Sequence, residues 1–323
     1  MPVRRISGIA VVISLTALAL VGCSSSPSAD SCEREYANTA ALDLVHVSDS
    51  DFGDKPDVTI AAPLHVEETA YTDTIVGDGN AIITPDQNIA FDITIYDGTS
   101  GAEVVSAGYN DAPATVNSLA RWVEAFPTFD EALQCATEGS RVVMALPPEA
   151  VVDDMRSNLQ LEEDASIVVV LDLQKVYLAA ADGADQYNDR SGMPTVVHAP
   201  DGRPGIIVPD SPAPTDLTIQ VLKKGDGETV TGDAPVRLHY TGVTWDEGTV
   251  FETTWDGEAQ SITLSDMPDG FEQAVEGQTV GSQILVVVPP ELGYGSEAQG
   301  KVPADSTLVY VIDILGVDEP VSP

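Results

Sequence analysis

The chain of 323 residues contains two copies of one sequence pattern. Residues 129–149 and 271–291 align without a gap: the copies open with FDEA and FEQA, and both end with PPE. Matching segments flank both copies. Upstream, the GDG triplet at 77–79 matches the one at 225–227. Downstream, a nine-residue segment that begins and ends with Asp matches in each copy, 164–172 with 305–313. The same parts in the same order predict two units of one fold. The Ala-, Asp- and Gly-rich residues 178–193 are expected to separate them.

The second copy predicts a sheet and one short helix. Val236, Leu238 and Tyr240 alternate with polar residues, which is the period of a half-buried strand. Residues 270–277 are bounded by glycines and carry apolar residues at i, i+3 and i+4, which indicates a helix with one apolar face. Further strands are expected at 250–254, 261–264, 283–288 and 307–317, the last of them β-branched and central. The pattern predicts an α+β layer, an antiparallel sheet packed on one short helix.

The charge balance excludes one class of partner. Lys and Arg total 14 and Asp and Glu total 52, which gives a net charge of −38. So acidic a surface repels phosphate, which argues against nucleic-acid binding and against electrostatic adhesion to anionic lipid. The 3 cysteines and 4 histidines are scattered without zinc-site spacing, so neither a metal site nor another cofactor is expected.

The N-terminus is predicted to be an export signal. Arg4 and Arg5 precede an uncharged, mostly apolar stretch, 6–22, which is marginal for a transmembrane helix but suits a signal-peptide core. The stretch ends in LVGC, which resembles the bacterial lipobox and implies that Cys23 is lipidated and becomes the mature N-terminus. Residues 1–22 are thus expected to be removed, and 23–50 to form a lipid anchor and a flexible tether. The alternative is an ordinary secreted protein with an incidental cysteine.

Two further cysteines, Cys32 and Cys135, suit one disulfide, because the extracytoplasmic space permits such a bond. The alternative is two unpaired thiols, one in the tether and one buried. The sequence gives no distance between them, so both remain open.

The second copy resembles the FKBP family, the macrolide-binding class of peptidyl-prolyl cis-trans isomerases. The resemblance runs from Asp216 to Val317 and rests on motifs in order: GDG at 225–227, VRLHYTG at 236–242, VFETT at 250–254, PDGF at 268–271, PPELGYG at 289–295, VP at 302–303 and TLVY at 307–310. It implies a hydrophobic pocket between sheet and helix. The expected fold is α+β, with two tandem FKBP-like domains, each an antiparallel β-sheet wrapped around a short α-helix.

The resemblance also implies which residues form the site. Tyr240, Glu252 and Tyr294 would take the catalytic positions, with the Tyr294 hydroxyl donating to a substrate carbonyl and Glu252 orienting the Tyr240 hydroxyl. The substrate would contact six further residues, with Phe271 as the floor (Phe251, Met267, Pro268, Phe271, Val302 and Tyr310). Without the motif order, Phe271, Val302 and Tyr310 would equally suit an ordinary core.

The second copy departs from the family pattern near the pocket. Glu252 stands where the family has Asp, and Gln260 where it has an aromatic residue. Trp255 is expected to fill the side that Gln260 leaves open. These changes bear on the rate and on macrolide affinity more than on the fold.

The first copy keeps the scaffold and loses the pocket hydroxyls. Phe129 keeps the floor position, but three other pocket positions change (Ile93 for Tyr240, Val104 for Phe251, Val152 for Tyr294). An extra segment, 108–123, is expected to cover or reshape this pocket. The predicted organisation is a degenerate FKBP-like domain at 51–178, a linker at 179–193 and an isomerase domain at 194–318.

The sequence predicts a lipid-anchored prolyl isomerase on the extracytoplasmic face of the cell membrane, which assists the folding of secreted or envelope proteins. Its expected partners are proline-containing extracytoplasmic polypeptides and, through the lipid, the membrane, with macrolides as candidate inhibitors. The alternative is a non-catalytic chaperone or scaffold that binds extended segments. A third hypothesis is a lipoprotein with a purely structural role.

Overall fold

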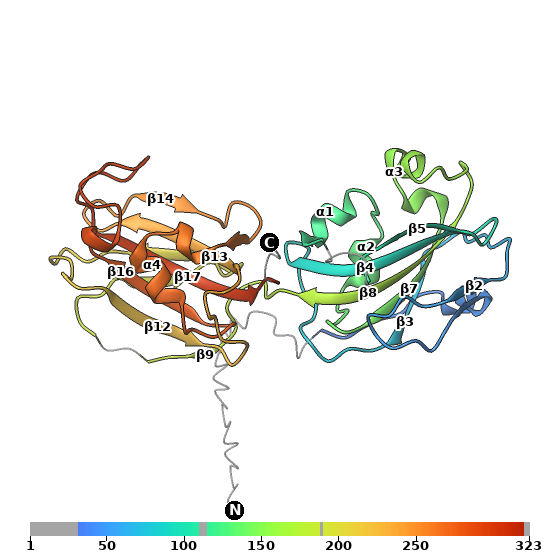
Figure 1. Cartoon of the computed structure of the whole chain (residues 1–323), viewed down its shortest axis with the longest axis horizontal. Coiled ribbons are helices and arrows are strands. Elements are labelled where there is room, and N and C mark those ends of the chain that lie inside the picture. Colours follow the sequence, from blue (N-terminus) through green and yellow to red (C-terminus); the bar gives the residue numbers. More distant parts are fainter. Residues whose placement is uncertain (1–31, 110–114, 188–189, 320–323) are drawn as a thin grey trace, which may run out of the picture.

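The computed structural model describes residues 32–109, 115–187 and 190–319. These residues form two β-sheet units side by side along the long axis of the molecule, each with short helices packed against it (Figure 1). The predicted signal peptide, 1–22, and the predicted lipidation site, Cys23, lie outside the described residues. Within the described ranges, no helix has both the length and the apolar character needed to cross a membrane.

The second unit is an antiparallel sheet with the strand order β14-β13-β17-β16-β12-β9, and β15 also pairs with β13. Its strands are β9 (Ala184–Asp185), β12 (Thr218–Lys224), β13 (Val236–Thr244), β14 (Val250–Thr253), β15 (Gln260–Ile262), β16 (Gln283–Val288) and β17 (Leu308–Val317). Strand β17 lies in the middle of the sheet, which confirms the prediction from its β-branched run. The predicted helix is α4 (Asp269–Val275).

The first unit repeats this topology, because its strand order β3-β7-β8-β4-β5 matches β12-β16-β17-β13-β14. Its strands are β3 (Ala70–Ile75), β4 (Asn88–Asp97), β5 (Glu103–Ala107), β6 (Asn117–Ser118), β7 (Arg141–Leu146) and β8 (Ile167–Val176). Helix α2 (Phe129–Leu133) takes the place of α4. The sequence repeat is therefore a repeat of the fold: two tandem α+β units, each an antiparallel sheet around a short helix.

Two α-helices belong to the first unit alone, α1 (Leu119–Val123) and α3 (Asp153–Asn158). Short 3-10 turns complete the fold: η2 (Thr39–Leu44), η3 (Pro148–Ala150), η4 (Leu264–Asp266) and η5 (Pro290–Leu292). The turns η3 and η5 occupy matching places, since each begins at the second proline of its PPE motif. Proline suits the first turn of a helix because the amide hydrogen that it lacks would have no partner there.

Each core lies between the sheet and its short helix. Phe129 on α2 and Phe271 on α4 are both 0% exposed. Burying one such side chain contributes about 1.5–3 kcal/mol. From the sheet, Leu238 and Tyr240 face the second core, as the two-residue period of β13 predicts.

The predicted tether, 23–50, is wrong from Cys32 onward, because these residues fold onto the first unit. Strand β1 (Val45–Val47) pairs with β2 (Val58–Ile60). Arg34 forms an ion pair with Asp73 at 2.8 Å. Cys32 forms a disulfide with Cys135, with the two Cα atoms 5.4 Å apart.

The predicted linker, 179–193, also differs, because much of it is part of the second unit. Strand β9 extends the second sheet by pairing with β12. The buried carboxylate of Asp313 accepts a hydrogen bond from the backbone amide of Ala181 at 2.8 Å. A hairpin of β10 (Thr195–His198) and β11 (Pro204–Ile207) follows and packs its inner side chains against the outer face of the sheet.

Contacts between the described residues of the two units include one between a cation and an aromatic ring and two hydrogen bonds. The Arg237 guanidinium lies 5.0 Å from the centre of the Tyr177 ring. The Ser118 hydroxyl, at the start of α1, donates to the Glu258 carboxylate at 2.7 Å. The backbone amide of Leu178 donates to the carbonyl of Leu315 at 3.1 Å.

Candidate functional site

The second unit contains a cluster of aromatic rings between sheet and helix. Phe271 lies at the centre, with its ring 5.5 Å from that of Tyr240 and 5.1 Å from that of Tyr310. Phe251 packs edge-on against Tyr310 at 5.6 Å. These edge-to-face arrangements are the favoured geometry of aromatic pairs. The four rings form a wall and a floor of the kind that the family resemblance implies.

The sheet register explains how these rings meet. Tyr310 on β17 lies opposite Gly242 on β13. A Cβ atom at Gly242 would lie only 2.4 Å from the Phe251 ring and 3.0 Å from the Tyr310 ring. Glycine at this position therefore makes the space in which Phe251 crosses over the sheet to reach Tyr310.

Tyr240 is 3% exposed, and its hydroxyl lies against Glu252 on β14. Burial, followed by the charge of Glu252 and a hydrogen bond to it, raises the pKa of Tyr240 above its usual range. The phenol therefore stays protonated at any physiological pH. Glu252 itself is exposed, at the sheet edge.

Tyr294 lies on the loop after η5, half-buried against the same cluster. Burial is the largest cause of its raised pKa. The next residue, Gly295, has φ of +61°, a backbone conformation that favours glycine. Its amide donates to the carbonyl of Pro290 at 2.9 Å, which folds the loop back.

Seven of the nine predicted pocket residues pack into this one cluster (Tyr240, Phe251, Met267, Phe271, Tyr294, Val302 and Tyr310). Of the other two, Pro268 is the N-cap residue of α4, and Glu252 reaches the cluster through Tyr240. Val302 is 3% exposed on a turn closed by hydrogen bonds to and from Gln299. Sequence reasoning missed Leu264 and Leu292, which pack in the same cluster; both lie in short 3-10 turns without a periodic signal.

Trp255 does not fill the side of the pocket beside Gln260. Its ring stacks on the imidazole of His239 at 4.3 Å. His239 neighbours Tyr240 along β13, so its side chain points to the opposite face of the sheet. The expectation for Trp255 was wrong because Trp255 lies in a turn after β14, where the amide of Gly257 donates to the carbonyl of Thr254 at 3.1 Å.

The corresponding space in the first unit is filled. Phe126 is 2% exposed and stacks on the floor residue Phe129 at 4.7 Å. Trp122, from the extra segment before it, packs on Phe91 at 4.6 Å. The first unit therefore covers its own floor with aromatic side chains.

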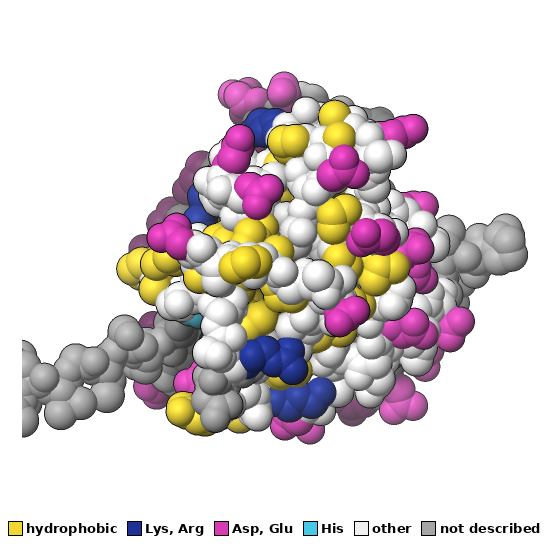
Figure 2. Space-filling model, turned by 90° about the vertical axis from the view of Figure 1, so that its left-hand side faces the viewer, with side chains coloured by type: hydrophobic (Ala, Val, Ile, Leu, Met, Phe, Trp, Pro, Cys, Tyr) yellow, Lys and Arg dark blue, Asp and Glu magenta, His cyan; other side chains and the backbone are white. Residues whose placement is uncertain are grey.

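Figure 2 shows the end of the second unit that points away from the first. Hydrophobic side chains gather near the middle of this face, and Asp and Glu side chains lie around them.

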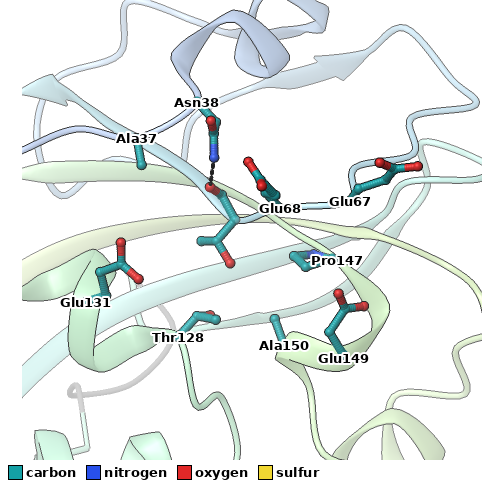
Figure 3. A pocket seen from close by; sticks show the side chains of 10 residues that line it. Ala37, Asn38, Glu67, Glu68, Thr128, Glu131, Pro147, Glu149 and Ala150 are labelled. Atoms are coloured by element: carbon teal, nitrogen blue, oxygen red, sulfur yellow. Dashed lines mark hydrogen bonds between the residues drawn. The ribbon is translucent and has the colours of Figure 1, made fainter.

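A separate recess of about 380 Å³ lies in the first unit, where the chain near Asn38 passes α2 and η3 (Figure 3). Four carboxylates line it (Glu67, Glu68, Glu131 and Glu149). The Asn38 amide donates across it to the carbonyl of Thr69 at 2.9 Å. In the described part of the chain, no His, Cys, Asp and Glu side chains group in a way that would hold a metal ion.

Comparison with known proteins gives one family. Residues 226–315 match the model of the FKBP-type peptidyl-prolyl cis-trans isomerase family. A probable FK506-binding protein of Corynebacterium glutamicum is 33% identical over 114 residues, which cover 35% of this chain and 97% of that protein. The FKBP-type isomerase FkpA of Aeromonas hydrophila is 33% identical over 105 residues, 32% of this chain and 39% of that protein.

Among solved structures, the three FKBP domains of wheat FKBP73 align with 77% of this chain and 94% of that chain, at 18% identity and a TM-score of 0.33. FkpA from Escherichia coli aligns with 40% of this chain and 53% of that chain, at 28% identity and a TM-score of 0.31.

Proposed function

The chain belongs to the FKBP family of peptidyl-prolyl cis-trans isomerases, and we propose that its second unit catalyses the rotation of X-Pro bonds in proteins outside the cytoplasm, where a lipid on Cys23 holds it at the membrane. The observation that carries the catalytic part is the cluster of Tyr240, Phe271 and Tyr310, buried between sheet and helix. The proposal about location is supported by the apolar stretch 6–22 and the LVGC sequence that ends it.

The chemistry needs no nucleophile and no metal. An X-Pro bond prefers trans by only about 0.5–1 kcal/mol, yet a rotation barrier of about 18–20 kcal/mol separates the two forms, because twisting the bond breaks amide resonance. A catalyst lowers this barrier by binding the twisted amide better than either planar form. A dry pocket favours the twisted amide, whose carbonyl has less charge separation than the planar form.

The roles follow from the geometry. Phe271 forms the floor on which the proline ring would pack. The Tyr294 hydroxyl, on a half-buried loop at the rim, would donate a hydrogen bond to a substrate carbonyl. Glu252 would hold the Tyr240 hydroxyl in place on the opposite side.

The test is a protease-free prolyl isomerisation assay on the mature chain without its lipid. We expect acceleration that Tyr294→Ala removes. Val152→Ala, the matched change in the first unit, should leave the rate unchanged. A correctly folded protein that does not accelerate the reaction would refute the enzymatic role and favour a chaperone that only binds extended segments.

The location has its own test. Cells grown with labelled palmitate should incorporate the label into the wild-type chain and sediment it with membranes. Cys23→Ser should lose the label and leave the membrane fraction. A variant that remains membrane-bound would contradict lipid anchoring at this cysteine.

A further inference from the structure

Tyr310 has a hydroxyl group that the fold does not use. Its side chain is 0% exposed, in the middle of the central strand β17. Among the described residues, its oxygen makes no hydrogen bond of regular geometry. The ring alone accounts for the packing against Phe251 and Phe271.

An unpaired buried hydroxyl is costly. Leaving such a group without a partner costs free energy, and phenylalanine would fill the same space without that cost. The Tyr310 hydroxyl therefore does not serve stability in the unliganded protein. Buried polar groups of this kind in a binding pocket acquire partners when the ligand arrives.

The group that the Tyr310 hydroxyl faces is Tyr294. Burial, and next the proximity of Tyr294, raise the pKa of Tyr310, so the phenol is always protonated and available as a donor. For Tyr294, burial raises the pKa, and the proximity of the Tyr310 hydroxyl lowers it by a smaller amount. The two phenol groups therefore lie near each other within one cluster, with Tyr310 the more deeply buried.

The first unit lacks both hydroxyls. Val169 pairs with Ile95 and Met144, just as Tyr310 pairs with Gly242 and Val286. Val152 stands opposite Tyr294 in the aligned repeats. The two phenols thus occur together in the second unit and are absent together from the first unit, in which Phe126 stacks on the floor residue Phe129.

We propose that Tyr310 is a positioning residue for prolyl isomerisation: when an X-Pro segment binds, the Tyr310 hydroxyl donates to the Tyr294 oxygen, which leaves the Tyr294 proton directed at the carbonyl of that segment. This inference rests on the proposed function of the second unit. Two hydroxyls in series also polarise each other, which strengthens the bond to the substrate. The effect appears mainly in kcat, because holding the carbonyl in the geometry of the twisted amide matters in the transition state and not in the planar ground state.

The experiment is a double-mutant cycle on the full mature chain, with a synthetic tetrapeptide that contains one leucyl-prolyl bond. Tyr310→Phe should lower kcat about fivefold, the value of one ordinary hydrogen bond, with KM changed less than twofold. In a Tyr294→Phe background, the same substitution should change kcat less than twofold, because its route to the substrate is gone. The urea midpoint of Tyr310→Phe should equal or exceed that of wild type, since no formed bond is lost.

Two results would overturn the proposal: wild-type kcat in Tyr310→Phe, or an equal loss in both backgrounds, which would mean that Tyr310 acts independently of Tyr294. If the wild-type chain shows no isomerase activity, the proposed function fails instead. In that case, calorimetry would measure the binding of the same tetrapeptide to the wild type, the two single variants and the double variant. Non-additive losses in affinity would support the coupling between Tyr310 and Tyr294, and additive losses or none would refute it.

Discussion

Ile93 and Tyr240 occupy the same position in the two sheets. Ile93 on β4 pairs with Leu171 on β8, and Tyr240 on β13 pairs with Ile312 on β17. Both partners directly precede the buried aspartate that ends each aligned segment. At one position of one fold, the first unit therefore has an aliphatic side chain and the second has a phenol beside a carboxylate. The difference predicts that catalysis belongs to the second unit alone.

Replacing Tyr240 by Phe should test this directly. The ring would still pack on Phe271, but the link to Glu252 would be lost, so kcat/KM should fall about 3- to 10-fold, the range for one ordinary hydrogen bond, because the exposed Glu252 carboxylate is screened by solvent. The isomerisation assay measures the effect, with Ile93→Val as the matched change in the first unit. Wild-type activity in Tyr240→Phe would show that the Glu252 contact has no catalytic role.

Sequence periodicity was sufficient to predict the strands and the helix of the second unit, because the patterns that indicate them lie within each short segment. Alternation along 236–240 predicted the face of Tyr240, and the glycines at 270 and 277 predicted the helix to within two residues of the observed ends of α4. The match between Val104 and Phe251 also holds, because each is the extra residue at a bulge on the strand that returns from the hairpin.

What the sequence could not predict depends on distant contacts. The sequence after Cys32 resembles a tether, but residues distant in the sequence attach it to the first unit: Cys135 through a disulfide with Cys32, and Asp73 through an ion pair with Arg34. Likewise, nothing near Ala181 shows that its amide will meet the carboxylate of Asp313. The sequence also could not predict that the Tyr310 hydroxyl has no hydrogen-bond partner, because an aromatic residue in an apolar strand indicates only a core position.

The two floor phenylalanines offer a matched pair of variants. Phe129→Leu and Phe271→Leu both open a cavity under a short helix, and each should destabilise its unit by less than the 3–5 kcal/mol or so that Phe→Ala costs in a core. Only Phe271→Leu should reduce isomerase activity measured on the folded protein. Urea unfolding and the isomerisation assay provide the two readouts. Equal loss of activity in both variants would mean that the first unit supports catalysis.

The Cys32–Cys135 disulfide should stabilise the first unit. It closes a loop of 103 residues, and removing a bond of this kind costs about 2–5 kcal/mol, because the unfolded chain gains conformational freedom. Calorimetry of the double variant Cys32→Ser, Cys135→Ser should show a lower melting temperature for the first unit. The isomerisation rate at 25 °C should be retained, since neither cysteine lies in the second unit. An unchanged melting profile would contradict a stabilising role.

His239 should make the second unit sensitive to acid. Its imidazole is 7% exposed, stacked on Trp255, and its Nδ1 lies 2.9 Å from the Thr254 hydroxyl. Burial, followed by the nearby Arg203 cation, lowers the pKa of His239 from 6.5 to about 4, and Asp201 opposes this only weakly. The folded state thus favours the neutral ring.

The sign of the effect follows from linkage. A histidine with a depressed pKa contributes stability that is fully present above pH 6.5, its unfolded value, and is lost as the pH falls toward 4. The shift corresponds to about 2 kcal/mol lost by pH 5 and about 3 kcal/mol by pH 4. Because carboxylates also titrate in this range, the measurement is the difference between wild type and His239→Gln in urea unfolding at pH 7.5, 5 and 4. The stability difference between the two proteins should shrink or reverse on acidification. Parallel pH profiles would show that the ring accepts its proton in the folded state as readily as in the unfolded chain.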